Sequence, residues 1–353
     1  MTDTGATPAG CRSLDEAVRI ADETLLPAAP EVDGAERVPR SHFDLLAEHG
    51  FYGFAAPEDL TTLDFPSYAA ACRAVESLAG GCLATTLVWV QHHGAVSALS
   101  KTANRELREV RLKPLAEGRL RSGVAVTAAV RPGTPMLRAE PVDGGWVFDG
   151  TAPWVSGWGM VDTLYTAARS ADDVLVMALL DAEEGGSVSA GPPARLVAAQ
   201  ASRTVTLRFS RHFVPRERVV QTVPLEDYRK GDPESVRFNG NLALGVAGRA
   251  VALMGDDGGA LSAQLAAARR RLLNAAPEDV PAARAVVSGF AVRAAAALAV
   301  HAGGRSLLAD AHAQRLTREA TFLLAFGSRP AVRTALLRGL GSQERSAGGA
   351  ETA

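Results

Sequence analysis

The period of the hydrophobic pattern changes twice along this chain of 353 residues. Apolar residues recur at helical spacing from about 13 to 118, in short β-type runs from about 121 to 220, and at helical spacing again from about 236 to 342. A segment with the hydrophobic period of a helix does not form a stable strand, and a segment with the period of a strand does not form a stable helix. The order of helices, strands and helices therefore predicts an α+β protein that is mostly α.

The middle region is predicted to hold strands without helices between them. Its β-type runs are VAVTAAV, MLRAEPV, GWVFDG, TLYTAA, VLVMALL, RLVAA and RTVTLRF. Turn-rich pieces such as VRPGTP, DGG and EEGG separate these runs. This arrangement favours a compact antiparallel barrel or sandwich over a doubly wound sheet.

The same changes of period predict the domain bounds. We expect a disordered N-terminus at 1–12, an N-terminal helical domain at 13–120, a β-barrel-like domain at 121–220, a C-terminal helical bundle at 221–342 and a disordered tail at 343–353. Two or three packed subdomains suit a chain of this length.

Composition excludes several classes of partner. The formal net charge of −2 gives no reason to expect nucleic acid or an anionic membrane. Cys11, Cys72 and Cys82 lack a metal-like spacing, so we expect no metal site and three reduced thiols in a cytoplasmic protein. The first ten residues have no basic start and no apolar core, and therefore predict no signal peptide. The longest apolar stretch is Ala-rich and interrupted by Arg293, which favours a buried helix over a membrane span.

Three segments carry a resemblance to a known family. WVFDGTAPWVSGWGMVDTLYTAARS resembles the signature "aromatic, apolar, apolar, Asn/Asp, Gly, then Trp, Ile/Val, Thr/Ser" of the acyl-CoA dehydrogenase superfamily. RTVTLRFSRHFVPRERVV is similar to the family's strand that leads into a V-P-x-x-x-V/L exit, and HAGGRSLLADAHAQRLTREA resembles its double-glycine turn and R-(D/E)-A helix. The resemblance covers about 13 to 340. It implies an N-terminal helical domain, a central β domain and a C-terminal four-helix bundle.

The resemblance also implies a FAD cofactor, held between the β domain and the bundle. Trp154 stands where the family packs an indole against the isoalloxazine ring, and Ser156 stands where its Thr or Ser gives a hydroxyl to flavin N5. Val155 lies between them in the same signature. A donor at N5 favours the charge that develops there on reduction, and an indole covers the ring from water. For Trp158, to which no family role attaches, we expect core packing.

Three further cofactor-binding residues follow from the resemblance. Thr127 falls near the family's V-T-E-P-G-A-G-S-D loop, although the loop here reads VTAAVRPGTP, without the acid and the glycine-serine run. Gly303 and Gly304 match the family's glycine turn, whose amides approach the FAD of a neighbouring subunit. A simple helix stop is the alternative for this glycine pair.

The family's usual catalytic base is missing. In its commonest branch a glutamate, eight or nine residues after R-D-A, removes the substrate α-proton while hydride leaves for the flavin. Counting from Arg318, Glu319 and Ala320, that position is Gly327. A second branch keeps its base on the first helix of the bundle, where the nearest segment here, AAARRRLLNAA, has no glutamate. Losing a general base costs roughly 10² to 10⁴ in rate unless another group replaces it.

That segment also covers the place of the family arginine that contacts the FAD pyrophosphate of the partner subunit. Arg269, Arg270 or Arg271 is the candidate replacement, and the alternative is a solvated basic face.

His92 and His93 are the remaining candidates for proton transfer. They are adjacent in LATTLVWVQHHGAVSAL, which predicts a buried helix because it is apolar nearly all round. Neighbouring helical residues point about 100° apart, so at most one of the two enters any given cavity. The resemblance places this helix at the substrate pocket, where related flavin monooxygenases of the same fold use histidines. An imidazole suits proton transfer to an oxygen better than abstraction from carbon, and a structural histidine is the alternative for each.

Three functions remain open from the sequence. The first is a FAD-dependent oxidoreductase of acyl-CoA dehydrogenase type, acting on an acyl-CoA, a carrier-bound acyl group or a related small metabolite. The second is a flavin-dependent monooxygenase or oxidase of the same fold that uses His92 or His93. The third is a non-catalytic subunit of a heteromeric acyl-CoA dehydrogenase. The resemblance implies a homo-oligomer, dimer or tetramer, or a hetero-oligomer with a homologue.

Overall fold

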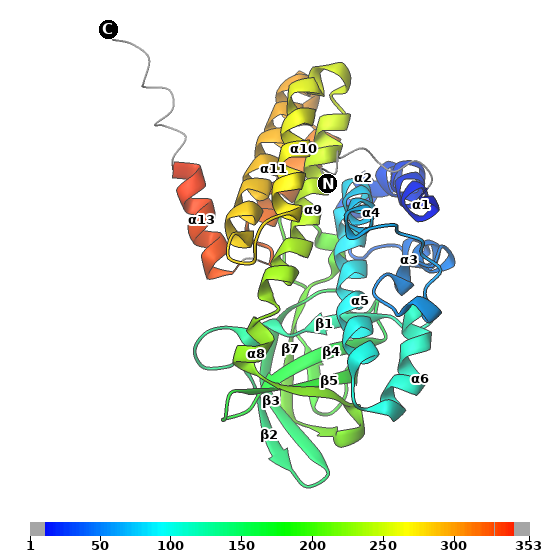
Figure 1. Ribbon diagram of the computed structural model, residues 1–353, viewed down its shortest axis with the longest axis vertical. Coiled ribbons are helices and arrows are strands. Elements are labelled where there is room, and N and C mark those ends of the chain that lie inside the picture. Colours follow the sequence, from blue (N-terminus) through cyan, green and yellow to red (C-terminus); the bar gives the residue numbers. More distant parts are fainter. Residues whose placement is uncertain (1–10, 328, 342–353) are drawn as a thin grey trace. The chain divides into compact units, whose positions relative to one another are not determined.

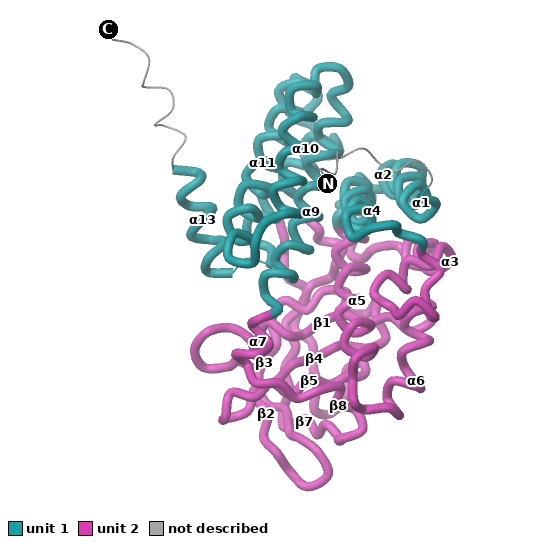
Figure 2. Tube along the Cα trace, in the orientation of Figure 1, with its two compact units in different colours: residues 1–33, 64–83, 231–353 teal, residues 34–63, 84–230 magenta. Residues whose placement is uncertain are grey.

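The structure is a computed structural model that describes residues 11–327 and 329–341, which fall into two compact units (Figures 1 and 2). Unit 1 comprises Met1–Asp33, Asp64–Leu83 and Gly231–Ala353, and unit 2 comprises Gly34–Leu63 and Ala84–Lys230. Each unit combines segments that are far apart in the sequence, whereas the predicted domains are continuous segments. The predicted domain bounds therefore stay a prediction.

The two predicted disordered ends lie mostly outside the described residues. At the start of the described part, Cys11 is buried and the first helix begins at Arg12, one residue earlier than the period predicts.

Unit 1 is helical. Its α-helices are α1 (Arg12–Ile20), α2 (Leu26–Gly34), α4 (Tyr68–Gly81), α9 (Asp232–Ala252), α10 (Gly259–Leu273), α11 (Val280–Ala302), α12 (His312–Ala325) and α13 (Pro330–Gly341). Short turns of other helix types are η1 (Ala21–Leu25), η6 (Gly255–Gly258) and η7 (Gly303–Leu307). Helices α9 to α12 form a bundle in which α11 packs on the other three. The predicted C-terminal four-helix bundle is thereby confirmed.

Helix α4 crosses α9 where both helices carry a glycine. A Cβ on Gly80 would lie 2.8 Å from the carbonyl oxygen of Gly245, and a Cβ on Gly245 would overlap the carbonyl of Glu76. Only glycine allows two backbones this close. This crossing brings Glu76, on α4, next to α10, which becomes important below.

Unit 2 combines a sheet with helices. Its helical elements are α3 (Arg40–Glu48), η2 (Phe51–Gly53), η3 (Glu58–Leu60), α5 (Leu83–Lys101), α6 (Arg105–Ala116), α7 (Thr127–Val130), η4 (Gln200–Ser202), η5 (Arg216–Arg218) and α8 (Leu225–Arg229). Its strands are β1 (Ser122–Ala125), β2 (Leu137–Val142), β3 (Gly145–Val155), β4 (Thr163–Arg169), β5 (Val174–Asp181), β6 (Val188–Ala190), β7 (Val205–Pro215) and β8 (Val219–Pro224).

The eight strands form one mostly antiparallel sheet in the order β6-β7-β3-β2-β4-β5-β8, with β1 paired to β4. Both β1 and β2 pair with β4 in parallel. The core of this unit lies where α5 and α6 cover β4 and β5, and its central residues include Val96, Leu99, Leu115, Leu175, Met177 and Leu179. The predicted α+β class with a β domain between helical regions is confirmed.

Two predicted strands differ from the observed ones. In VAVTAAV the strand ends at Ala125, and Thr127 begins the short helix α7. RLVAA is not a strand, because Ala199 takes a positive φ of 53° and leads into the turn η4. Strands β6 and β8, which are short or lie at the end of the sheet, were not predicted.

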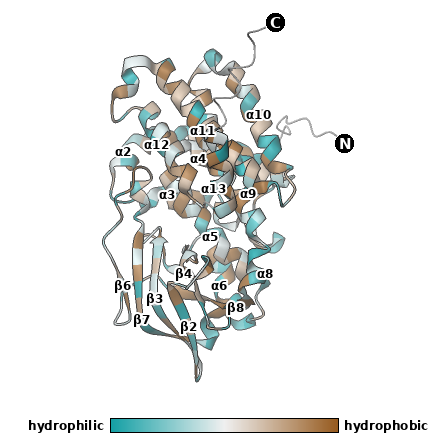
Figure 3. Cartoon of the chain, turned by 90° about the vertical axis from the view of Figure 1, so that its left-hand side faces the viewer, coloured by the Kyte–Doolittle hydropathy of each residue, from teal (hydrophilic) through white to brown (hydrophobic). Residues whose placement is uncertain are grey.

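One described stretch, Val280–Leu307, is long and apolar enough to cross a membrane by length and composition, with a mean hydropathy of 1.6. It contains α11, whose residues are mostly apolar (Figure 3). In the structure 44% of its most apolar window is buried, and a core helix passes the same test. This stretch is therefore weak support for a membrane span.

Candidate functional site

Trp154 projects from a bulge near the end of β3. The pairing of β3 with β7 shifts between Ala152, opposite Leu207, and Val155, opposite Val205, so β3 holds one extra residue. Trp154 takes a φ of 65° and is 55% exposed. A left-handed backbone is costly for a bulky residue and persists only where the surroundings impose it. The bulge therefore holds a large aromatic side chain outside the core of unit 2.

Ser156, two residues further on, is buried and bonded to a second hydroxyl. Its Oγ lies 2.7 Å from Oγ1 of Thr204, which lies 2.9 Å from Oγ of Ser202. The backbone is tied at the same place, since the N–H of Gly157 donates to the carbonyl of Ser202 at 2.7 Å. Thr204 and Ser202 were missed by the sequence analysis. The only signal for them is the hydroxyl-rich ASRT before a predicted strand, and nothing in the sequence pairs it with a segment 48 residues earlier.

The neighbours of this pair are core residues. Val155 is fully buried and Trp158 is 7% exposed, as expected for a tryptophan that packs in the core. The two tryptophans of the segment therefore have different surroundings, and only Trp154 presents an accessible ring.

The other predicted cofactor residues are not all in the same unit. Thr127, half-buried at the start of α7, belongs to unit 2 with Trp154 and Ser156. Gly303 and Gly304 belong to unit 1 and are exposed. Gly303 has a φ of 57° and ends α11, so the glycine pair does serve as a helix stop. A role for Thr127, Gly303 and Gly304 in cofactor binding stays a prediction.

His92 is held by backbone groups on both sides of its ring. The N–H of Ser122 donates to Nδ1 at 3.0 Å, and Nε2 lies 3.1 Å from the carbonyl oxygen of Leu115. Because Nδ1 accepts, the proton must sit on Nε2, and the ring is neutral. Burial lowers the pKa of His92 to about 3. This histidine joins α5 to the end of α6 and the start of β1, which is a structural role.

His93 has a different environment on the same helix. Its ring packs edge-on against Trp89, with centroids 4.6 Å apart, and lies 5.2 Å from the ring of Phe54. Neither Nδ1 nor Nε2 has a hydrogen-bond partner among residues 11–327 and 329–341, although the side chain is 5% exposed. Burial, and then the neighbouring His92, hold the pKa of His93 well below its ordinary value. Of the two histidines, His93 alone keeps both nitrogens available.

His92→Gln is expected to make unfolding less sensitive to acid. The pKa is about 3 in the folded chain and near 6.5 unfolded, so between these values only the unfolded chain takes up the proton, and stability falls as pH drops below about 6.5. The amide of glutamine keeps one donor and one acceptor but does not titrate. Urea unfolding from pH 7 to about pH 4.5 should show a slope smaller by roughly 1 kcal/mol per pH unit. His212→Gln, at a half-buried ring, is the matched control and should change the slope less. An unchanged slope in His92→Gln would contradict the buried neutral ring.

The position of the family's glutamate carries no side chain. Gly327 follows the end of α12 with a φ of 62°, and a Cβ there would lie 3.3 Å from Nδ2 of Asn239 on α9. The buried carboxylate on α12, Glu319, is engaged by Arg315 at 2.8 Å. The three atoms nearest to a Cβ at Gly327 all belong to Asn239, which carries an amide and not a carboxylate.

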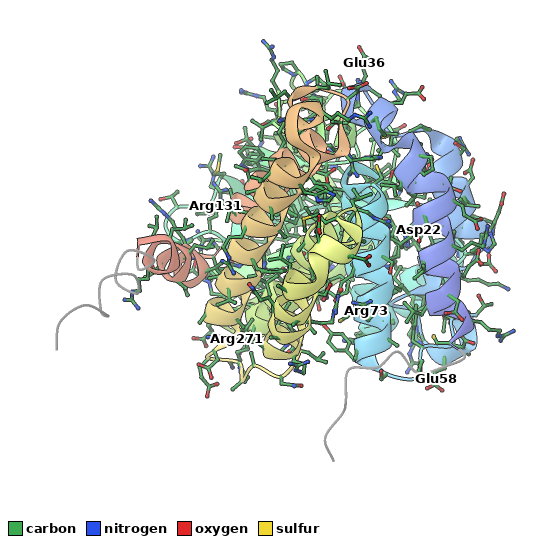
Figure 4. All side chains as sticks on the ribbon, turned by 90° about the horizontal axis from the view of Figure 1, so that it is seen from above. Asp22, Glu36, Glu58, Arg73, Arg131 and Arg271 are labelled. Carbon is green, nitrogen blue, oxygen red and sulfur yellow. The ribbon has the colours of Figure 1, made fainter. Side chains whose placement is uncertain are left out.

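The arginine run lies on α10, the second helix of the bundle and not the first, because α9 already ends at Ala252. Arg269 reaches the buried carboxylate of Glu76 with Nε and Nη2 at 2.7 to 3.0 Å, so it is a structural residue. Arg73, beside Glu76 on α4, joins the same cluster at 3.1 Å. Figure 4 labels Arg73 and also Arg271 of the arginine run. Arg270 and Arg271 are exposed, so for these two residues both the contact to a partner subunit's FAD and the solvated face stay predictions.

Comparison with known proteins agrees with this architecture. The family model described as "Acyl-CoA dehydrogenase, N-terminal domain" matches residues 12–119. Benzylmalonyl-CoA dehydrogenase of Aromatoleum aromaticum is 26% identical over 243 residues, which are 66% of this chain and 63% of that protein. The chain spans between half and two thirds of the length of the curated relatives it matches.

Solved structures share the fold over nearly the whole chain. Butyryl-CoA dehydrogenase from Megasphaera elsdenii superposes with a TM-score of 0.81 at 18% identity, covering 98% of this chain and 100% of that one. A glutaryl-CoA dehydrogenase from Mycobacterium smegmatis, in complex with FADH2, gives a TM-score of 0.80 at 14% identity, covering 93% of both chains. The family match and the sequence relatives thus link residues 12–119 to the N-terminal domain of the acyl-CoA dehydrogenase superfamily, and the solved structures show that the chain has the fold of these enzymes.

Proposed function

We propose that the protein is a FAD-dependent oxidoreductase of acyl-CoA dehydrogenase type that acts on an acyl thioester, an acyl-CoA or a carrier-bound acyl group, or on a related small metabolite. The observation that carries this proposal is the pairing of an exposed indole at Trp154 with a buried hydroxyl at Ser156, both imposed by the local backbone. The superfamily and the FADH2 complex of a structural neighbour support the cofactor.

The residues of this segment fit a flavin. Trp154 offers a flat apolar face that a ring system would cover, and this removes the cost of leaving a large aromatic side chain in water. Ser156, two residues further on, offers a hydroxyl that is held by Thr204. Thr127, from the same unit, is the proposed third contact. FAD, when bound, supplies the acceptor for a hydride taken from the substrate.

The proton that leaves with the hydride needs an acceptor other than the family's glutamate. Gly327 has no side chain, and Glu319 is bonded to Arg315 in the interior of unit 1. A glutamate-based α-proton abstraction of the ordinary kind is therefore not proposed.

A second candidate function is a flavin-dependent monooxygenase or oxidase, and His93 favours it. A neutral imidazole with two unpartnered nitrogens accepts a proton from an oxygen acid more readily than from a weak carbon acid. Its location among aromatic rings keeps water from competing for these nitrogens. In this case, the partner of reduced flavin is molecular oxygen.

We also propose that the protein works in the cytoplasm as a homo-oligomer, a dimer or a tetramer, or together with a homologue. The net charge of −2 gives no support for a nucleic acid or membrane partner.

Anaerobic titration of the FAD-loaded protein with a panel of acyl-CoA thioesters, followed by visible absorbance, tests the leading proposal. Bleaching by at least one straight-chain, branched or aryl acyl-CoA supports a dehydrogenase. No bleaching anaerobically, combined with substrate-dependent oxygen uptake that His93→Ala abolishes and His92→Gln retains, would replace it with the second candidate. If both assays are silent and the protein co-purifies with a homologue that has the glutamate, it is a non-catalytic subunit.

Gly327→Glu is expected to weaken the fold without restoring the family reaction. A non-glycine residue at a φ of 62° costs roughly 1–2 kcal/mol, and the new side chain meets the amide of Asn239. Urea unfolding should show a loss of that size, while bleaching by acyl-CoA stays at the wild-type level. The control Gly255→Ala, at a φ of 57° with no neighbour within 4 Å, should show the cost of the positive φ without the contact to Asn239. A gain in bleaching rate above tenfold in Gly327→Glu would contradict this account of the base position.

A further inference from the structure

We propose that Ser202 donates a hydrogen bond to Thr204 and that Thr204 donates to Ser156. In this hydrogen-bond chain the hydroxyl of Ser156 keeps its own proton and donates it to a group other than these three residues. Ser202 and Thr204 are then positioning residues for the hydroxyl of Ser156. The identity of the acceptor, flavin N5, rests on the proposed function, whereas the direction of the chain does not.

The three hydroxyls are close and buried. Oγ of Ser202 lies 2.9 Å from Oγ1 of Thr204, and Oγ1 of Thr204 lies 2.7 Å from Oγ of Ser156. Ser202 is fully buried, Thr204 is 4% exposed and Ser156 is 6% exposed. Exposure thus rises along the series, with Ser202 at its innermost end.

Counting protons gives the direction. Each hydroxyl has one proton to donate and can accept from others. For Ser202, Thr204 is the only side-chain partner within the described residues, so the proton of Ser202 goes to Thr204. Thr204 then donates to Ser156, and Ser156 keeps its own proton. The reverse direction would leave the O–H of Ser202 buried without an acceptor, which proteins avoid.

The backbone prevents the chain from reorganising. Gly157 N–H donates to the carbonyl of Ser202, and Ala194 N–H donates to the carbonyl of Thr204 at 2.8 Å. The intervening Arg203 takes a φ of 46°, which places Ser202 and Thr204 on a sharp turn before β7. The three oxygens are therefore held from two separate backbone segments, and only the protons have freedom to move.

The hydroxyl proton that Ser156 keeps determines which kind of group Ser156 can bind. A hydroxyl whose acceptor side is occupied by Thr204 presents a donor, so it selects a lone pair and discriminates against another N–H or O–H. In the oxidised ring N5 carries a lone pair, whereas the reduced ring carries hydrogen there. The hydrogen-bond chain therefore presents Ser156 as a donor to N5 of the oxidised ring, the form that accepts the hydride.

The direction can be tested without cofactor, by thermal unfolding of the full-length protein. Thr204→Val removes the acceptor of the Ser202 proton and should lower Tm by several degrees. Adding Ser202→Ala to that variant removes the buried hydroxyl that has no acceptor, and should recover part of the lost Tm. Thr204→Ser keeps the chain and should behave like wild type. Thr166→Val, at a fully buried threonine of β4 outside the chain, is the matched control for the change of shape. No recovery in the double variant overturns the proposed direction.

The role toward the cofactor is tested separately, by titrating FAD into each variant. Ser156→Ala and Thr204→Val should both raise the Kd of FAD by about 3- to 10-fold, the effect of one neutral hydrogen bond. Thr204→Ser and Thr166→Val should leave it unchanged, and the shape of the visible band should shift only in the first two. If the wild-type protein binds no FAD, the proposed function fails. The unfolding experiment still tests the direction of the hydrogen-bond chain in that case. If Thr204→Val binds FAD like Thr204→Ser, the positioning role is wrong.

Discussion

Trp154→Ala is expected to weaken FAD binding by about 10- to 100-fold. Stacking of an aromatic side chain on a ring system is worth about 1–3 kcal/mol by alanine substitution, and tenfold in Kd corresponds to 1.4 kcal/mol. Since Trp154 is 55% exposed in unit 2, its removal leaves no cavity, and stability should change by no more than about 0.5 kcal/mol. Fluorescence titration of the apo-protein with FAD measures the Kd.

Two control variants are needed to interpret the change in FAD affinity of Trp154→Ala. Trp154→Phe retains a flat ring and should keep most of the affinity. Trp158→Phe reduces a buried tryptophan in the same segment and should lower stability without an equal loss of FAD affinity. Unchanged FAD affinity in Trp154→Ala would show that the exposed indole serves another purpose.

Arg315→Met is expected to lower the free energy of unfolding by about 3–5 kcal/mol, the usual cost of leaving one member of a buried ion pair alone. The side chains of Arg315 and Glu319 are 2% and 4% exposed and are joined by a bond of 2.8 Å between Nη1 and Oε1. Burial raises the pKa of Glu319 while the neighbouring Arg315 lowers it, so the negative charge of Glu319 is favoured by this partner. Urea unfolding near pH 7 measures the loss.

The double variant Arg315→Met with Glu319→Leu is the control. Replacing a buried ion pair by apolar residues of similar volume is often neutral or stabilising, so the double variant should recover most of the loss. Nε of Arg315 and Oε2 of Glu319 have no partner in the described residues, which makes this replacement easier. If the double variant is as unstable as Arg315→Met, the pair has a further structural role.

Features that depend on local pattern could be predicted from the sequence. The change of period gave the order of helices and strands, because side-chain periodicity follows directly from helix and strand geometry. The segment around Trp154 and Ser156 was singled out by its residue types and their spacing. RLVAA failed as a strand because Ala199 adopts a left-handed backbone, for which an alanine gives no warning.

Features that depend on packing across the chain could not be predicted. Ser156 meets Thr204 only because β3 and β7 pair, and Glu76 meets Arg269 across 193 residues. His92 and His93 are equivalent in sequence, and only the carbonyl of Leu115 and the amide of Ser122 distinguish them. The left-handed backbone of Trp154 likewise arises from the bulge between two strands.

The central claim is that this chain binds a flavin at Trp154 and Ser156. The most direct measurement is the visible absorbance spectrum of the purified protein after incubation with FAD and removal of free cofactor by gel filtration. Our account predicts a yellow protein with stoichiometric FAD in the wild type, and a much reduced content in the variant that combines Trp154→Ala with Ser156→Ala. A colourless wild-type protein, or equal FAD content in both, would contradict it.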